Sequence, residues 1–320
     1  MVFAAAGTWG DVQPHVALAK HFGGKLLCDE KWVDSARRFE IDVEPLCKPI
    51  NHQQSLSGFV SSIDYPAVFR SLYEASDGAQ AIVTSFFLWP AKIVAEIRGI
   101  PWIATTDSPL YFNRHVGIDV DVMHAVADIM NGIREVVGID RVSDALHTEK
   151  LIGLSPAWLG RSIFNPLGFL TPHNLAVEQP QLPKEAFCYV SLGSASYGIS
   201  NELLIACKLL GLHCVCTGDG VSDEHVTYIP FDVGVDASRI FESAKMAIIH
   251  GGTATACQAL KAGTPIIVKP TGLDQFFNAE WLSIHGATLW PSIKAKAVKL
   301  EIESREEILT GVEKLFSEWL

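Results

Sequence analysis

A glycine turn with a histidine and hydroxyl side chains is where this sequence most plainly offers chemistry. The run His250-Gly251-Gly252-Thr253 leads from an apolar strand pattern into a helical one. A helix that starts after such a turn presents unpaired N–H donors and a positive dipole end, and glycines let a ligand approach the backbone. His250 and Thr255 add side-chain donors. The pattern predicts a diphosphate cradle, and a tight turn with an internally bonded histidine is the alternative.

A polar pair follows the next apolar run. Asp274 and Gln275 come after the carboxyl end of the predicted strand Pro265–Lys269. Their side chains can accept hydrogen bonds from the vicinal hydroxyls of a sugar and donate to them. Together with the cradle, the pair predicts a site for one ligand, a sugar nucleoside diphosphate. Asp274 could instead serve only as the N-cap of a helix.

An acidic residue stands in a second glycine turn near the N-terminus, Gly7-Thr8-Trp9-Gly10-Asp11-Val12-Gln13-Pro14. Ligands of open α/β sheets bind beyond the carboxyl ends of the strands, so Asp11 is expected to project into that crevice, where it could act as a base. Aspartate is also common at helix N-termini, where it only stabilises the helix. Position alone leaves both roles open.

A small-residue loop, Leu192–Gly198, stands between another predicted strand and helix. The backbone N–H groups and hydroxyls around Gly193 and Ser194 could hold phosphate oxygens. The loop lacks the Gly-x-Gly-x-x-Gly spacing and the lysine of a P-loop, so by itself it is a weak signal.

Apolar, β-branched runs alternate with amphipathic stretches in both halves of the chain, which is typical of βα repeats around parallel sheets. The Pro- and Gly-rich stretch that follows residue 156 separates the halves. We expect two doubly wound α/β domains, at 1–172 and 185–320, joined by a linker at 173–184. The second should end in a helix that begins with the capping box Ser304-x-x-Glu307.

Composition narrows the class of protein. The 320 residues suit two domains, and a net charge of -11 without a basic cluster argues against nucleic-acid or anionic-membrane partners. An N-terminal signal pattern and an apolar run of membrane-spanning length are both missing, so we expect a cytoplasmic protein. The seven scattered cysteines lack zinc-site spacing, so we expect neither a metal nor a disulfide framework.

The motifs combine into a family pattern. The series His250-Gly251-Gly252, Ala259-Leu260-x-x-Gly263-x-Pro265 and Pro270-x-x-x-Asp274-Gln275-x-x-Asn278-Ala279 resembles the donor-binding signature of the UDP-glycosyltransferase superfamily, which includes bacterial antibiotic and sterol glycosyltransferases. The segment from Gly7 to Ala19 is similar to the opening motif of that family. Tyr228-Ile229-Pro230-Phe231 is similar to its nucleobase-binding turn.

This resemblance implies a GT-B fold, in which two Rossmann-like domains face each other across a cleft. The C-terminal domain would hold the donor and the N-terminal domain the acceptor. It further implies an inverting, metal-independent transfer of a hexose, expected to be glucose, from a UDP-sugar to a hydroxyl of a small-molecule or lipid-like acceptor. The UDP-sugar would be a co-substrate, and no other cofactor is implied.

The resemblance also implies roles for single residues. Asp11 matches the general base. The residues that match diphosphate contacts are His250, Gly251, Gly252, Thr253 and Thr255, with a second phosphate loop at Gly193 and Ser194. Asp274 and Gln275 match sugar-hydroxyl contacts. Tyr228 and Phe231 match the nucleobase turn, and Gly10 is a donor-binding residue in the opening motif.

Two other classes of protein fit the same residues. A nucleotide-sugar epimerase can share the two-domain architecture, but it needs acid and base residues acting on the sugar ring, and no such set stands near Asp274. A non-catalytic nucleotide-sugar-binding protein would keep the cradle without needing Asp11. Replacement of Asp11 separates these readings from a transferase.

Overall fold

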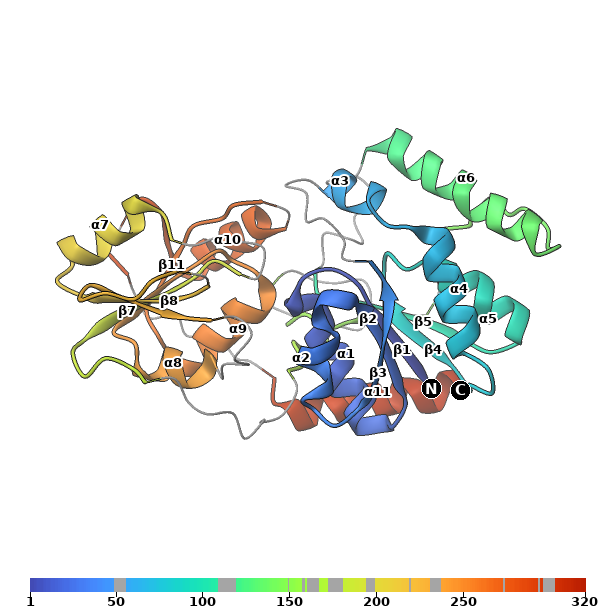
Figure 1. Cartoon of the computed structure of the whole chain (residues 1–320), viewed down its shortest axis with the longest axis horizontal. Coiled ribbons are helices and arrows are strands. Elements are labelled where there is room, and N and C mark those ends of the chain that lie inside the picture. The colour runs from blue at the N-terminus through green and yellow to red at the C-terminus, as the bar shows by residue number, and fades with distance from the viewer. Residues whose placement is uncertain are drawn as a thin grey trace. The chain divides into compact units, whose positions relative to one another are not determined.

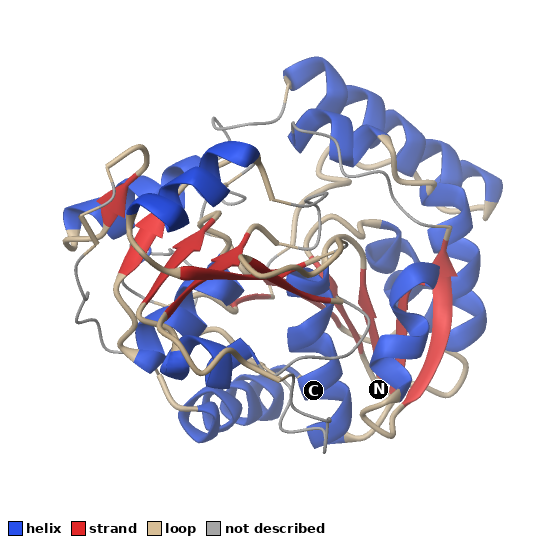
Figure 2. Cartoon of the chain, turned by 60° about the vertical axis from the view of Figure 1, so that its left-hand side comes forward, coloured by secondary structure: helices blue, strands red, loops and turns tan. Residues whose placement is uncertain are grey.

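The chain forms two compact units, each built on one sheet. The computed structural model describes residues 1–48, 56–108, 119–148, 150–156, 159, 167–171, 181–193, 199–218, 220–230, 237–272, 274–292, 294–295 and 303–320. The first unit consists of Met1–Ala157, Arg161–His173 and Glu303–Leu320, and the second of Trp158–Gly160 and Asn174–Ile302. Figures 1 and 2 show helices flanking the sheet in each unit.

The first sheet is six-stranded, with the order β3-β2-β1-β4-β5-β6 and parallel pairing throughout. Its strands are β1 (Val2–Ala5), β2 (Lys25–Asp29), β3 (Asp42–Cys47), β4 (Ile82–Ser85), β5 (Trp102–Thr106) and β6 (Leu151–Gly153). The helical elements of the unit are α1 (Trp9–Phe22), the 3₁₀ turn η1 (Glu30–Trp32), α2 (Val33–Arg37), α3 (Leu56–Ser61), α4 (Tyr65–Ala75), α5 (Pro90–Arg98), α6 (Val120–Val136) and α11 (Arg305–Trp319). The strand order reverses between β1 and β4, which is the switch point where doubly wound sheets bind ligands.

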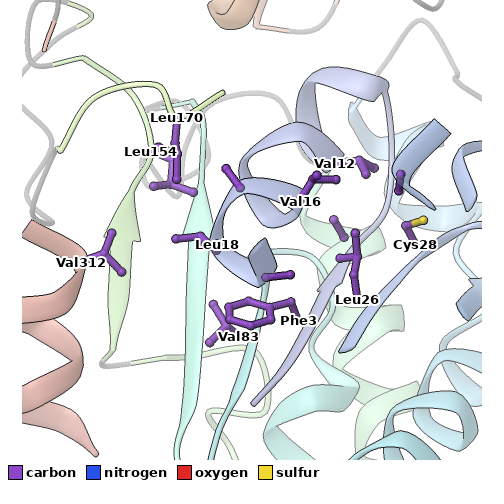
Figure 3. Packing of buried hydrophobic residues seen from close by; sticks show 14 of the residues in the cluster. Phe3, Val12, Val16, Leu18, Leu26, Cys28, Val83, Leu154, Leu170 and Val312 are labelled. Carbon is purple, nitrogen blue, oxygen red and sulfur yellow. The ribbon is translucent and has the colours of Figure 1, made fainter. Parts of the chain in front are cut away.

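Both faces of this sheet are covered, so its central strands are apolar runs rather than alternating ones. All four residues of β1 are buried. Phe3 of β1 and Val12 and Val16 of α1 belong to one buried core cluster (Figure 3). Val312 of α11 joins the same core cluster.

The second sheet repeats this topology in the order β12-β11-β10-β7-β8-β9, again with parallel pairing. Its strands are β7 (Phe187–Ser191), β8 (His213–Thr217), β9 (Val226–Ile229), β10 (Met246–Ile249), β11 (Ile266–Val268) and β12 (Thr288–Leu289). Its helices are α7 (Asn201–Leu209), α8 (Ala237–Ser243), α9 (Thr253–Ala262) and α10 (Gln275–Ile284). The helices α8, α9 and α10 share one core cluster and α7 belongs to another, so both faces are again buried. The switch point lies between β7 and β10.

The end of the second predicted domain differs from the observed unit. The sequence predicted a C-terminal domain from 185 to 320, whereas α11 belongs to the first unit. Its apolar face, with Ile308, Val312 and Phe316, is buried in the core of that unit. The capping box between Ser304 and Glu307 is confirmed. Helical spacing and a cap predict a helix, but they carry no information about which sheet will cover its apolar face.

Candidate functional site

His250 lies at the switch point of the second sheet, directly after β10. Its side chain is buried, and its Nδ1 is 3.2 Å from the carbonyl oxygen of Ser191, the last residue of the neighbouring strand β7. Two glycines make room for the ring: a Cβ on Gly193 would stand 2.7 Å from His250 Nε2, and a Cβ on Gly252 would also overlap that atom. The imidazole therefore fills the space between the turns that follow β7 and β10.

The protonation of His250 follows from these contacts. Burial lowers the pKa of His250 to about 4, so the ring is neutral near pH 7. The Ser191 carbonyl can only accept a hydrogen bond, so Nδ1 carries the hydrogen and Nε2 carries a lone pair. An anionic phosphate oxygen could therefore bond to Nε2 only when the ring takes up a second proton.

The turn after His250 feeds directly into α9. Gly251 has a φ of +92°, a left-handed conformation that favours glycine, and Gly252 precedes the helix as its N-cap. Thr253 is buried in the first turn of the helix and Thr255 is half-buried. The N–H groups of this first turn are the donors predicted for a diphosphate.

Asn278 connects the two halves of the predicted donor site. Its amide nitrogen donates to the carbonyl oxygen of Gly251 (2.9 Å) and lies 3.2 Å from Asp274 Oδ2. The side chain of Asn278 is fully buried. Asn278, which was quoted in the family motif but given no role, thus holds the glycine turn and the start of α10 together. The sequence held one signal for this contact, because Asn278 follows Asp274 by four residues and the two side chains therefore lie on one face of the helix.

The side chains of Asp274 and Gln275 make different hydrogen bonds. Asp274 is the N-cap residue of α10, and its carboxylate accepts from Asn278. The side-chain oxygen of Gln275 accepts from the N–H and hydroxyl of Thr271 and from the N–H of Gly272 at 2.9–3.2 Å. Three donors saturate that oxygen, so Gln275 could reach a sugar hydroxyl only through its amide nitrogen.

The remaining donor-site predictions are spread along the carboxyl edge of the second sheet. Tyr228 lies on the terminal strand β9, with β7 and β8 between it and β10. Its half-buried ring packs where a Cβ on Gly220 would be. Ser194 and Phe231 lie outside the described residues.

Asp11 lies in the first turn of α1, immediately after β1, and Gly10 precedes it there. Its carboxylate oxygen Oδ2 accepts from the backbone N–H of Thr8 (2.5 Å) and from the Thr8 hydroxyl (2.7 Å). The capping role considered for Asp11 is thus present. Burial raises the pKa of Asp11 above its ordinary value, while the bonds from Thr8 and the charge of Lys31 oppose the rise. A half-buried carboxylate with a raised pKa can also act as a base, so the two roles are compatible.

His15 follows Asp11 by one helical turn and is buried, with 2% of its surface exposed. Its Nδ1 is 3.0 Å from the Asp11 carbonyl oxygen and its Nε2 is 3.0 Å from the Thr105 hydroxyl on β5. The histidine thereby ties α1 to the sheet, and its side chain does not face solvent. Burial lowers the pKa of His15 to about 4, which keeps it neutral.

The carboxylate of Asp29 is buried beside the turn at Gly7. It was not predicted from the sequence. Asp29 ends β2, has no exposed surface and accepts from the N–H of Gly7 at 3.1 Å. Burial raises the pKa of Asp29 to about 6. The signal available in the sequence was a lone acid at the carboxyl end of an apolar strand, Lys25 to Asp29.

This buried acid should make stability depend on pH. The pKa of Asp29 in the folded protein, about 6, exceeds its ordinary value of about 3.9. The folded protein therefore loses stability as the pH rises between these two values, by about 3 kcal/mol once Asp29 is ionised in both the folded and the unfolded protein. We expect the free energy of unfolding of Asp29→Asn, relative to wild type, to increase between pH 4 and pH 7 by a similar amount. Urea unfolding of both proteins at pH 4 and at pH 7 measures this difference in free energy. A difference that does not change with pH would contradict the expected effect.

Comparison with known proteins shows what this chain resembles. No family model matches the chain. A stretch of 100 residues is 32% identical to the sterol 3-beta-glucosyltransferase of Vanderwaltozyma polyspora, and the match covers 25% of this chain and only 8% of that enzyme. Within the described residues, no helix combines the length and apolar character needed to cross a bilayer.

Solved structures match over nearly the whole chain. The glycotransferase of kitacinnamycin aligns with 99% of this chain and 90% of its own at a TM-score of 0.68 and 17% identity. SnogD from Streptomyces nogalater aligns over 99% and 94% at a TM-score of 0.65 and 16% identity. VinC, solved in complex with dTDP, aligns over 99% and 91% at a TM-score of 0.63 and 15% identity.

These likenesses define the class of fold. The chain has the GT-B fold, with two six-stranded parallel sheets and flanking helices, as the sequence predicted. More particularly, the chain is similar in fold to the glycosyltransferases of kitacinnamycin and calicheamicin, and a short stretch of it is similar in sequence to a sterol 3-beta-glucosyltransferase. At these identities the comparison concerns architecture, and activity has to be argued from the site.

Proposed function

We propose that this chain is a glycosyltransferase that moves a sugar from a nucleoside-diphosphate sugar to a hydroxyl of an acceptor. The observation that carries the proposal is the Asn278 amide, which joins the glycine turn before α9 to the Asp274 carboxylate. The turn that we propose as the diphosphate cradle and the carboxylate that we propose for the sugar hydroxyls are thereby held close together at one edge of the second sheet.

The second unit is proposed to bind the donor. The N–H groups at the start of α9 and the protonated Nε2 of His250 would receive the diphosphate, and Asp274 with the Gln275 amide nitrogen would receive the sugar hydroxyls. The leaving diphosphate gains negative charge, which these donors stabilise without a catalytic metal. Apart from the nucleotide sugar, the proposal requires no cofactor.

Asp11 is proposed to be the general base. The acceptor hydroxyl oxygen forms a bond to the anomeric carbon while the bond from that carbon to the diphosphate oxygen breaks. The hydroxyl proton passes to the Asp11 carboxylate. Attack from the face opposite the departing diphosphate inverts the anomeric configuration in one displacement. Burial supports this assignment, because a carboxylate with a raised pKa accepts protons more readily.

The donor nucleotide and the acceptor class belong to the proposal as well. A UDP-hexose, with glucose foremost, is favoured by the sequence motif and by the partial match to a sterol 3-beta-glucosyltransferase. The VinC structure contains dTDP, so dTDP-sugars are the competing donors. The structure of the spinosyn rhamnosyltransferase SpnG contains a spinosyn aglycone, which supports a small-molecule acceptor. Seven free thiols favour a reducing compartment, so we propose the cytoplasm as the site of action.

Direct assay of transfer tests the proposal. The purified chain is incubated with UDP-glucose, UDP-galactose or dTDP-glucose and a panel of sterol, phenolic and macrolide alcohols, and nucleoside diphosphate release is measured together with the mass of the product. Release of the diphosphate with a matching glycoside supports the proposal. Tight binding of the nucleotide sugars with no turnover across the panel would favour the binding-protein alternative. A change in the sugar configuration without an acceptor would favour an epimerase.

A further inference from the structure

The backbone that precedes the proposed base is held by three separate side chains. The N–H groups of residues 6–8 donate, in order, to Ser85 Oγ (3.3 Å), Asp29 Oδ2 (3.1 Å) and Asp11 Oδ2 (2.5 Å). Ser85 comes from β4 and Asp29 from β2, the two strands that flank β1. This backbone is therefore tied to both neighbours of its own strand at the switch point of the sheet.

Gly7 is confined on its other sides. Trp32 Nε1 donates to the Gly7 carbonyl at 3.0 Å. The N–H of the same peptide group belongs to Thr8 and donates to the Asp11 carboxylate. Gly7 has a φ of +128°, and a Cβ there would overlap the Asp11 carboxylate. Gly7 and the carboxylate are thus in direct contact, so a displacement of the turn displaces the base.

Asp29 uses both of its carboxylate oxygens inside the fold. Oδ2 accepts from Gly7, and Oδ1 accepts from the thiol of Cys47 on β3 at 3.6 Å. With no exposed surface, Asp29 has no route to a substrate. An unexposed carboxylate lowers stability at neutral pH and is retained most readily where function needs it.

We propose that Asp29 is a positioning residue for Asp11, acting by holding the Gly7 turn in the geometry in which Asp11 receives the acceptor proton. The inference rests on the proposed function only for the catalytic role of Asp11. The bond to Gly7 is strongest when Asp29 is ionised, because charge-assisted hydrogen bonds are stronger than neutral ones. Protonation of Asp29 therefore loosens the turn, and activity should fall with it.

The ionisation of Asp29 is set by few neighbours. Within the part of the chain that the structure describes, the titratable groups acting on it are Asp11 on α1, Lys31 on η1, Cys28 beside it on β2 and Cys47 on β3. Burial raises the pKa of both thiols to about 12, so they stay neutral in the range of interest. The charge of Lys31 favours ionised Asp29 and that of Asp11 opposes it, while burial remains the largest cause of the raised pKa.

Kinetics of three variants test the positioning role. Asp29→Asn offers Gly7 an uncharged acceptor, as the protonated carboxyl does, so at pH 8 it should show the reduced kcat that the wild type reaches below pH 6 and should lose the part of the decline near pH 6 that Asp29 causes. Asp29→Ala removes the acceptor and should lower kcat by about 10- to 100-fold, with the KM for the donor unchanged. Cys47→Ala removes the opposite contact of the same carboxylate, which favours ionised Asp29, so it should leave kcat at pH 8 unchanged and move the decline in kcat to higher pH. Equal activity of Asp29→Ala and wild type would overturn the proposal.

A measurement without turnover keeps the inference separate from the proposed function. The amide signal of Gly7 in a ¹H–¹⁵N NMR spectrum should titrate near pH 6 in wild type and at higher pH in Cys47→Ala, and not in Asp29→Asn. A titrating Gly7 signal with no detectable glycosyl transfer would support the coupling of Asp29 to the turn while the proposed activity fails. A Gly7 signal that does not respond between pH 5 and pH 7 would refute the coupling, even if transfer is observed.

Discussion

Asp11→Asn should lower kcat by about 10²- to 10⁴-fold, the range expected when a positioned general base is lost, and should leave the affinity for UDP unchanged. The amide has the shape of the carboxylate, and its oxygen can still accept from the Thr8 N–H that Asp11 now binds. What it cannot do is take up the acceptor proton. Steady-state kinetics with the best acceptor give kcat, and calorimetric titration with UDP gives the dissociation constant.

The helix-capping explanation of Asp11 has a matched control in the same unit. Asp64 is the N-cap of α4, where it accepts from the N–H of Ala67 at 2.9 Å. Both substitutions remove a charged helix cap, so both should cost about 1 kcal/mol of stability or less. Only Asp11→Asn should lose turnover. If Asp11→Asn and Asp64→Asn were equally active, capping would be the whole role of Asp11.

Gly252→Ala should weaken UDP binding by about tenfold or more, a loss of roughly 1.4 kcal/mol or greater. Gly252 has φ -63° and ψ 142°, which any residue adopts, so the substitution adds no backbone strain. The new methyl group would overlap the imidazole of His250, which is held between Ser191 and the two glycine turns. The ring must then leave its position at the start of α9. Calorimetric titration of the variant with UDP and with dTDP measures the loss.

Gly132→Ala is the control for this substitution, because a Cβ at this site in α6 has open space around it. It should bind UDP normally and be slightly stabilised, since alanine is the better helix former. His250→Asn provides a second variant in case Gly252→Ala folds poorly. Wild-type affinity for UDP in both cradle variants would remove His250 from the donor site.

Most of the architecture was predictable from local pattern. Apolar runs bounded by glycine turns located the central strands, and helical spacing located α4 at Tyr65–Ala75 and the capped start of α11. Strands at the edges of the sheets, such as β3 and β12, were missed. Their residues alternate or are too few for periodicity to mark them, and they become strands because a neighbouring strand offers its free edge.

The glycine turn at His250 and the acid after Gly7 could be identified from the sequence because their chemistry depends on residues adjacent in the chain. Contacts between distant residues could not. The bond from Asn278 to Gly251 spans 27 positions, and that from Gly7 to Asp29 spans 22. The spacing along the chain sets the helix face that carries a side chain, but packing sets what that face meets. Only the folded sheet shows that His15 is buried and that Asp29, an ordinary acid in the sequence, is a buried carboxylate against the turn that carries Asp11.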